Sequence, residues 1–436
     1  MRGVFQKRIL LSALTGGFFL FAPGAAQSAI TGTGTCAGIT SPLTADLVCD
    51  GDVYVDNGSL LDLGNDVANV TLDVGSGTIC IGSDATPPCN TLTGTGTILV
   101  DPPGPTGTFG TINAANIVIG AGSALHADGS GCGPSESYDP GLPGCVDQGS
   151  GAIPGFGEGA DDLASLGGGG GAGYGGPGGA GHANSGSTLN PPGDSYGSTE
   201  LTTLMAGSGG GNNNDPSFGA PGGAGGGAIH ISVSGTLTHN GRISADGSNG
   251  SFTGTSYNGG GGSGGSLLIS AGTLTMGGGG IIRANGGNGG PASSTSRGGG
   301  GGGGGRVRID CNPCPLLNAS NLQSMGGAGG RGAVDGSAGT LLVVDNSGVP
   351  FPIITLGGSG ILPDIFDGTP DGNHNYATFF VQDAGTTGDI RSQGPGVVNG
   401  NLHIDSAFDF SGSVIVNGNF TSNAPPTVSG GVSTVN

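Results

Sequence analysis

The sequence predicts an all-β protein, a right-handed parallel β-helix (a solenoid) with glycine-rich insertions and β-rich flanks. Three observations predict this class. Glycine supplies 104 of the 436 residues and proline 26, a level typical of low-complexity chains. Hydrophobic residues nevertheless make up 34% of the chain, and they occur in short β-branched clusters that suit strands rather than disorder. Similar segments recur about every 40 residues, within the range of stacked repeat architectures.

Residues 1–28 predict a secretory signal peptide. The basic start MRGVFQKR precedes an apolar run and the small-residue ending AAQSA, with cleavage expected after Ser28. A membrane anchor is the weaker interpretation, because Gly16, Gly17 and Pro23 interrupt a short apolar run. We therefore expect a secreted protein, extracellular or at the surface of a Gram-negative bacterium, with no integral membrane span in the mature chain.

Residues 29–110 predict an N-terminal β-rich region with little oligoglycine. Segments such as DVYVDNGSLLDL alternate apolar and polar residues, as half-buried strands do. Two threonine runs, TGTGT at 31–35 and TLTGTGT at 91–97, could form ladders that order ice. Threonine also has a high strand propensity, and that explanation is the stronger one.

Eight cysteines remain after the leader, in four close pairs: Cys36 and Cys49, Cys80 and Cys89, Cys132 and Cys145, Cys311 and Cys314. An even number in an exported chain predicts disulfides. Proximity favours pairing between neighbours. The CxxC at 311–314 could instead be a redox or zinc motif, but no helix follows it and no second CxxC exists for zinc.

Residues 111–344 predict glycine-rich β-helical repeats. Four similar segments begin at positions 116, 228, 266 and 306, and each closes on a glycine-containing tetrad. The tetrad residues Asp246, Asn285 and Met325 lie 39 and 40 positions apart, and Asp128 lies 118 positions before Asp246. Glycine tracts separate the units. We expect these tracts to be either mobile or mutually hydrogen-bonded, the latter as extended threefold polyglycine II helices.

Residues 345–436 predict a C-terminal β-rich region that contains a candidate calcium site. Oxygen-bearing side chains surround a glycine turn, at Asp367, Asp371, Asn373 and Asn375, and such ligands suit Ca²⁺. The loop is not an EF-hand, because the glutamate at its twelfth position is missing. An Asx-rich turn explains the pattern equally well. Beyond Ca²⁺ we expect no cofactor.

No catalytic constellation is convincing, and we expect a protein that is not an enzyme. A GxSxG match at 261–265 lacks the strand-turn-helix context that a nucleophile elbow needs. His230 and His239 are dispersed, so they predict polar strand positions rather than metal ligands. A catalytic groove would need charged residues that recur on neighbouring coils, and these are Asp246, Asp310, Arg242, Arg283 and Arg308.

The charge excludes partners that need a basic surface. Lys7 is the only lysine, and the mature chain carries about −23 once the leader's three cations are removed. Nucleic acids and anionic membranes require clustered Lys and Arg. Bound cations, or a positively charged surface, fit this chain better.

The chain resembles the glycine-rich parallel β-helix surface proteins of bacteria, such as adhesin passengers, although no translocator domain is recognised after the repeats. The segment GGGGSGGSLLISAGTLTMGGGGIIRANGGNGG and its partners carry the resemblance, over about half of the chain. It implies a structural or adhesive surface protein that associates with itself, laterally or end to end, or with surface and matrix components. Two alternatives remain open: a polysaccharide lyase or hydrolase on a β-helix, and an ice-binding solenoid.

Overall fold

The computed structural model describes residues 30–345 with several short gaps, and beyond Asp345 only the backbone of ten strands. The predicted signal peptide and the candidate calcium loop at 367–375 lie outside the described residues. The gaps fall at 44, 65–69, 83–88, 90–94, 101–108, 135–136, 139–144, 147–166, 183–189, 198–200, 213–219, 253–257, 292–296 and 316–320.

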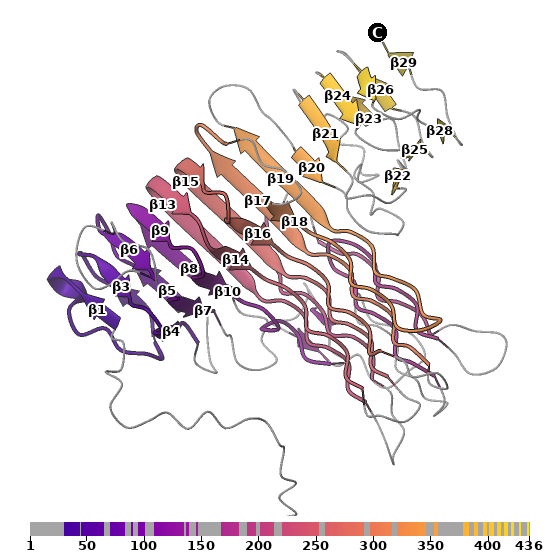
Figure 1. The fold of residues 1–436 in the computed structure, drawn as a ribbon, viewed down its shortest axis with the longest axis horizontal. Coiled ribbons are helices and arrows are strands. Elements are labelled where there is room, and N and C mark those ends of the chain that lie inside the picture. Colours follow the sequence, from indigo (N-terminus) through magenta and orange to yellow (C-terminus); the bar gives the residue numbers. More distant parts are fainter. Residues whose placement is uncertain are drawn as a thin grey trace, which may run out of the picture.

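The largest element is an eleven-stranded sheet in which nearly all neighbours are parallel (Figure 1). Its main path joins β1 (Ile30–Gly32), β3 (Val53–Val55), β6 (Thr78–Ile81), β9 (Asn116–Ile119), β13 (Ala228–His239), β15 (Ser266–Met276), β17 (Arg306–Cys311) and β19 (Thr340–Asp345). Beside this path lie β2 (Leu47–Val48), β5 (Val70–Asp73) and β8 (Phe109–Ala114). The long strand β13 pairs with β8 through its first half and with β9 through its second.

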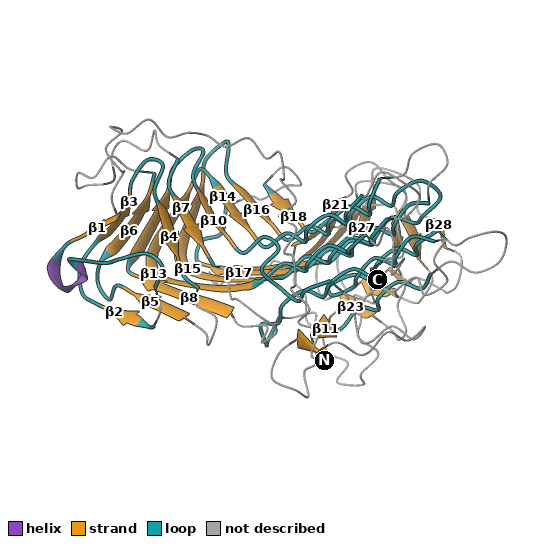
Figure 2. Ribbon diagram, turned by 90° about the horizontal axis from the view of Figure 1, so that it is seen from below, coloured by secondary structure: helices purple, strands orange, loops and turns teal. Residues whose placement is uncertain are grey.

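A second sheet of six parallel strands faces the first (Figure 2). It contains β4 (Leu60–Asp62), β7 (Thr97–Leu99), β10 (Ala124–His126), β14 (Arg242–Ser244), β16 (Ile281–Arg283) and β18 (Leu322–Gln323). The chain runs out along one sheet, turns, returns along the other, and then continues into a glycine segment. The short helix η1 (Gly34–Cys36) lies at the N-terminal end of the stack.

The core between the sheets consists of columns of apolar side chains in register. In the six-stranded sheet one such column is completely buried, with every member at most 1% exposed: Leu61, Ile98, Leu125, Ile243, Ile282 and Leu322. Ile231 and Ile269 belong to a matching column of the larger sheet. Each such side chain contributes about 1.5–3 kcal/mol through burial, so this core holds the two sheets together without any tryptophan.

The glycine tracts form a body of their own beside the sheets (Figures 1 and 2). Its extended segments are hydrogen-bonded mainly to one another, and they bond to the sheet where a tract meets the start of a strand, as Gly227 does to Ser266. Bonds to a given neighbour recur every third residue: Gly261 and Gly264 donate to Gly300 and Gly303. A three-residue repeat is the geometry of extended helices of the polyproline II type.

Central segments of this body each bond to six neighbours. In segment 258–265, Gly260 donates to Gly211, Gly261 to Gly300 and Gly262 to Ser248. The same three residues accept hydrogen bonds from three further segments, through Gly223, Ala172 and Gly287 respectively. Segment 298–305 repeats this pattern through residues 301–303. The backbone polar groups that an isolated glycine tract would leave unpaired are therefore satisfied inside the body.

Close approach explains why these positions are glycine. A Cβ added to Gly302 would overlap the carbonyl oxygen of Gly262, and one added to Gly301 would overlap that of Gly327. Neither conflict involves a flexible side chain that could move aside. The body therefore requires glycine for space rather than for unusual backbone angles.

The prediction of a right-handed parallel β-helix is wrong. The eleven-stranded sheet is mixed, because β1 runs antiparallel to β3. In addition, β11 (Ser137–Tyr138) and β12 (Cys145–Val146) form a separate antiparallel sheet. Three further parallel sheets are separate as well. Alternation in a sequence identifies a buried strand face, but it does not identify the strand's partner or direction. The tracts expected as insertions are also a continuous body, comparable in extent to the sheets.

The C-terminal strands form three small parallel sheets. The chain visits them in cyclic order, one strand in each sheet per round from β21 onward. The sheets contain β20 (Ile353–Thr355), β21 (Thr378–Gln382), β24 (Asn401–Ile404) and β27 (Phe420–Ser422); β22 (Gly388–Ile390), β25 (Phe408–Phe410) and β28 (Thr427–Val428); and β23 (Gly396–Val398), β26 (Val414–Val416) and β29 (Thr434–Val435).

The predicted neighbour pairing of the cysteines is confirmed. Cys36–Cys49, Cys80–Cys89, Cys132–Cys145 and Cys311–Cys314 are all disulfides. Four disulfides in one chain indicate an oxidising compartment. Among the described residues, no helix is long and apolar enough to cross a membrane.

Candidate functional site: a charged ladder on the six-stranded sheet

A row of polar side chains follows the outer face of the six-stranded sheet where its strands lead into the glycine body. Strand β14 shows the origin of the row, because Ile243 enters the core while Arg242 and Ser244 alternate to the other face. Strand register then places His126, Ser244 and Arg283 in one column across three neighbouring strands. A second column of side chains lies two residues after the end of each strand.

This second column, the Asx ladder, consists of Asp128, Asp246 and Asn285. Asp128 Oδ1 accepts the backbone N–H of Asp246 at 2.9 Å, and Asp246 Oδ1 accepts that of Asn285 at 2.8 Å. Asn285 Oδ1 accepts the N–H of Met325 at 2.8 Å. The tetrad spacing seen in the sequence is thus confirmed as a structural register. The ladder ends at Met325, whose side chain offers no oxygen.

The other carboxylate oxygen of each aspartate pairs with an arginine from the next strand. Arg242 Nη1 lies 2.6 Å from Asp128 Oδ2. Arg283 Nε lies 2.7 Å from Asp246 Oδ2, as an ion pair without a well-aligned hydrogen bond. On the following rung Asn285 Nδ2 donates to Gln323 Oε1 at 3.2 Å, an uncharged version of the same pair.

The pKa of Asp246 is raised to about 6, chiefly because the carboxyl is buried and in part because of the neighbouring charge of Asp128. Arg283, the backbone N–H of Asn285 and Arg242 act in the opposite direction without cancelling the shift. The negative charge of Asp128 on the adjacent rung therefore disfavours ionisation of Asp246. His126 adds a further titratable group, with Nδ1 3.6 Å from Asp128 Oδ2.

The five residues considered for a catalytic groove do not converge. Asp246, Arg242 and Arg283 lie together in the charged ladder. Arg308 and Asp310 lie on β17, on the outer face of the opposite sheet, and pair with each other at 3.0 Å. A sequence period aligns residues along the stack but does not reveal which of two sheets carries them, so the five residues divide into a group of three on one sheet and a pair on the other.

The two histidines singled out in the sequence have different environments. His230 lies half-buried on the outer face of the eleven-stranded sheet, and this desolvation lowers its pKa. His239 faces inward, in register with Ile119 and Met276, and is fully buried. Burial lowers the pKa of His239 to about 4, although its Nε2 lies 3.0 Å from the Ile281 carbonyl oxygen. The expectation of a polar face position is therefore wrong for His239.

Other candidate motifs are used within the structure. Ser263 of the GxSxG match is completely buried in the glycine body, where its Oγ accepts the Ser208 N–H at 2.9 Å. Within the described part of the chain, no group of three or more His, Cys, Asp or Glu side chains is arranged to hold a metal. The predicted calcium ligands Asp367, Asp371, Asn373 and Asn375 fall outside that part.

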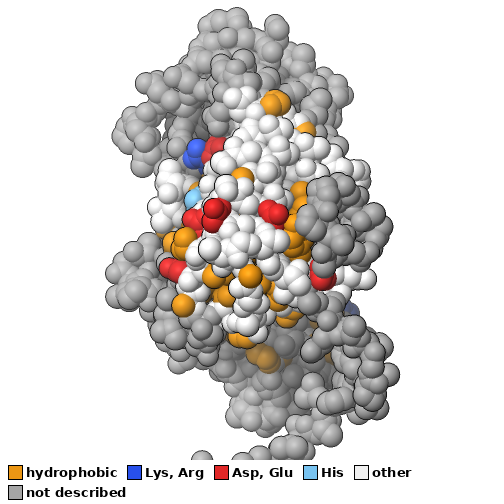
Figure 3. Space-filling model, turned by 90° about the vertical axis from the view of Figure 1, so that its left-hand side faces the viewer, with side chains coloured by type: hydrophobic (Ala, Val, Ile, Leu, Met, Phe, Trp, Pro, Cys, Tyr) orange, Lys and Arg blue, Asp and Glu red, His pale blue; other side chains and the backbone are white. Residues whose placement is uncertain are grey.

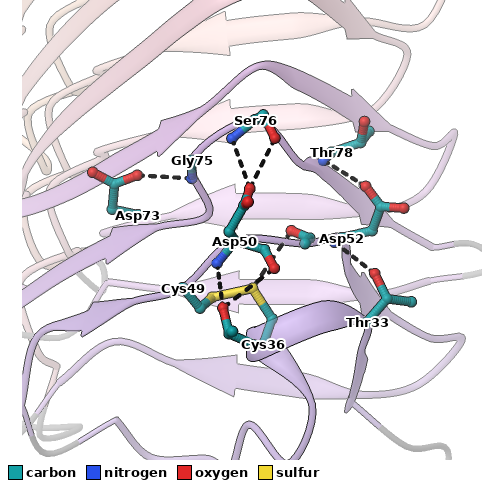
Figure 4. Close-up of a disulfide and its surroundings, with 11 residues drawn as sticks. Thr33, Cys36, Cys49, Asp50, Asp52, Asp73, Gly75, Ser76 and Thr78 are labelled. Carbon is teal, nitrogen blue, oxygen red and sulfur yellow. Dashed lines mark hydrogen bonds between the residues drawn. A yellow bond between two sulfur atoms is a disulfide. The ribbon is translucent and has the colours of Figure 1, made fainter.

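The N-terminal end of the stack carries a second ladder, next to the Cys36–Cys49 disulfide (Figure 4). Thr33 Oγ1 accepts the Asp52 N–H at 2.8 Å, and Asp52 Oδ1 accepts the Thr78 N–H at 2.8 Å. Thr35 Oγ1 likewise accepts the Asp50 N–H. Two threonines of the first run are therefore hydrogen-bonded to the segment that leads into β3. Carboxylates and hydrophobic side chains are both visible on this end (Figure 3).

Sequence reasoning missed Arg306, which is 3% exposed where the eleven-stranded sheet meets the glycine body. Its guanidinium donates to the Tyr196 carbonyl oxygen at 2.7 Å and to Thr340 Oγ1 at 3.1 Å, and it lies 5.4 Å from the centroid of the Tyr174 ring. Burial lowers its pKa. No local motif marks this role, because the three partners come from segments far apart in the sequence.

We compared the chain with protein-family models, with curated proteins and with solved structures, and none of them matches it.

Proposed function

We propose that this chain is an exported, non-catalytic structural or adhesive protein of the cell surface or extracellular matrix. One observation carries the proposal: the glycine body is built from backbone hydrogen bonds between extended segments, and central segments are bonded to six neighbours. Such a body offers shape and stiffness but very few reactive side chains. It is a costly structure for a soluble enzyme, since each ordered glycine loses more chain entropy than alanine would, by about 0.5–1 kcal/mol.

The side chains that a catalyst would need support the same proposal. Asp128 and Asp246 each use one carboxylate oxygen for the next backbone N–H and the other for an arginine. A general acid or base must reach a substrate proton, and these groups are already engaged within the stack. Their role as rungs of a ladder explains their positions without any reaction.

Repetition gives the proposed surface its adhesive character. The two sheets present the same columns of side chains rung after rung, with neighbouring strands about 4.8 Å apart. A repeated surface can bind a polymer or a second copy through many weak contacts at once. We propose as partners other copies of this chain and components of the surface or matrix, outside a Gram-negative cell.

Association and turnover test the proposal together. Sedimentation velocity and negative-stain electron microscopy of the purified mature chain should show concentration-dependent assemblies, or binding to isolated cell envelopes. Incubation with a panel of acidic and neutral polysaccharides should release no new reducing ends or unsaturated products. A strictly monomeric protein that binds no envelope would contradict the proposal, as would cleavage of a polysaccharide with multiple turnovers.

A further inference from the structure

The charged ladder contains hydrogen-bonding capacity that the protein leaves unused. Ser244 is completely buried beneath the row, and its hydroxyl has no hydrogen-bond partner among the described residues. Arg283 Nε is buried beside Asp246 without a well-aligned hydrogen bond. Protein structures seldom leave a buried hydroxyl in this state, so the Ser244 hydroxyl points to a ligand.

The unused groups are mainly donors. Arg242 and Arg283 come from neighbouring strands, and each contacts a carboxylate through one guanidinium nitrogen. Guanidinium groups carry five N–H donors and no acceptor, so donors remain on both. The two arginine side chains are 33% and 31% exposed, which makes them accessible from solvent.

We propose that Arg242 and Arg283, with the Ser244 hydroxyl at the base, form a binding site for an anionic group, a carboxylate or a sulfate. Planar guanidinium donors suit the oxygens of such groups. The chain as a whole is strongly acidic and repels anions at long range, so binding depends on these short contacts. This binding site is an addition to the proposed structural role, and its test does not depend on whether the chains associate.

Binding is coupled to a proton on Asp246. The charged groups around this carboxyl are Asp128 and His126 from β10 and the residues after it, Arg242 from β14 and Arg283 from β16. Asp128 pairs with Arg242, and Asp246 pairs with Arg283. When the pH falls through about 6, Asp246 takes up a proton and Arg283 loses its counter-charge, so the affinity for an anion rises as the pH falls.

Titration calorimetry on the mature chain at pH 5 and pH 7.5 tests the site with three probes: an oligouronate, its fully methyl-esterified form, and inorganic sulfate. We expect the oligouronate to bind at least about fivefold more tightly at pH 5, which is the lower end of the coupling usually found between two sites. Sulfate binding alone would identify a free anion as the ligand and still support the site. Equal binding of the neutral ester would overturn the proposal, as would no binding of either anion at pH 5.

Variants assign the binding to these residues. The double variant R242Q/R283Q should lose about tenfold or more in affinity, whereas Arg308→Gln, on the opposite sheet, should bind as the wild type does. Asp246→Asn keeps the ladder oxygen but removes the charge, so at pH 7.5 it should bind as tightly as the wild type does at pH 5. If the double variant and the wild type bind alike, or if Asp246→Asn retains the full pH dependence, the site is refuted.

Discussion

In the two sheets each strand is hydrogen-bonded to its neighbours on either side within one plane, whereas a central segment of the glycine body is bonded to six neighbours around it. The sheets obtain their stability from side chains such as Ile243 and Ile282, which fill the space between two layers. The glycine body has almost no side chains to bury and depends on close contact between backbones. One chain therefore combines two kinds of packing, side chain against side chain in the sheets and backbone against backbone in the glycine body. Mutations that remove or add side-chain atoms should affect the two regions in opposite ways.

The largest expected effect is cavity formation in the sheets. Ile243→Ala removes a completely buried side chain from the middle of an apolar column, and such truncations cost about 2–5 kcal/mol. Chemical denaturation followed by circular dichroism would measure the loss. A cost below about 1 kcal/mol would show that the column is not closely packed.

The glycine body should respond to the reverse change. Gly302→Ala places a Cβ against the carbonyl oxygen of Gly262, and overpacking of this kind costs about 1–3 kcal/mol. Gly278→Ala is the matched control, because a Cβ at this turn position meets no atom within 4 Å. The same denaturation experiment should leave the control unchanged within about 0.5 kcal/mol. Equal stability of the two variants would remove the distinction between the regions.

A buried histidine should make the sheets sensitive to acid. The folded-state pKa of His239 is lowered to about 4 from 6.5, so the unfolded chain binds the proton more readily. The free energy of unfolding is therefore unaffected by this group above pH 6.5, and it decreases by about 3 kcal/mol in total as the pH falls from 6.5 towards 4. His239→Leu should flatten the dependence of unfolding free energy on pH in this window. His230→Gln, on the outer face, should alter it less.

Asp246 should act with the opposite sign, next to the glycine body. Its pKa is raised to about 6 from 3.8, so the folded chain holds the proton more tightly and stability declines as the pH rises from 3.8 to 6. Asp246→Asn should abolish this decline, since asparagine retains the oxygen that accepts the Asn285 N–H. Asp310→Asn is the control on the other sheet. Parallel pH profiles for the wild type and Asp246→Asn would contradict the assignment.

Part of this architecture could be predicted from the sequence. Close cysteine spacing gave the four disulfides, and the 39- and 40-residue steps gave the register of Asp246, Asn285 and Met325. These features depend on local spacing or on exact repetition. The threefold hydrogen bonding of the tracts was one of two arrangements considered, because unpaired glycine backbones need partners.

The remainder depends on contacts between distant segments. The separation of Arg308 from Arg242 requires knowing that successive strands alternate between two sheets. The burial of Arg306 depends on Tyr196 and Thr340, which lie 110 and 34 residues away. The polarity of His239 suggested an outer position, although the alternation with Leu237 and the register with Ile119 and Met276 place it inside.

The central claim is that the glycine tracts form an ordered body. Amide hydrogen exchange, measured by NMR on ¹⁵N-glycine-labelled protein, tests this claim most directly. The account predicts that Gly260–Gly262 and Gly301–Gly303 exchange as slowly as residues within β13 and β15, because each of these amides donates to a neighbouring segment. Gly278, in an exposed turn, should exchange rapidly. If the tract amides exchange as fast as Gly278, the tracts are not hydrogen-bonded to one another and the claim is contradicted.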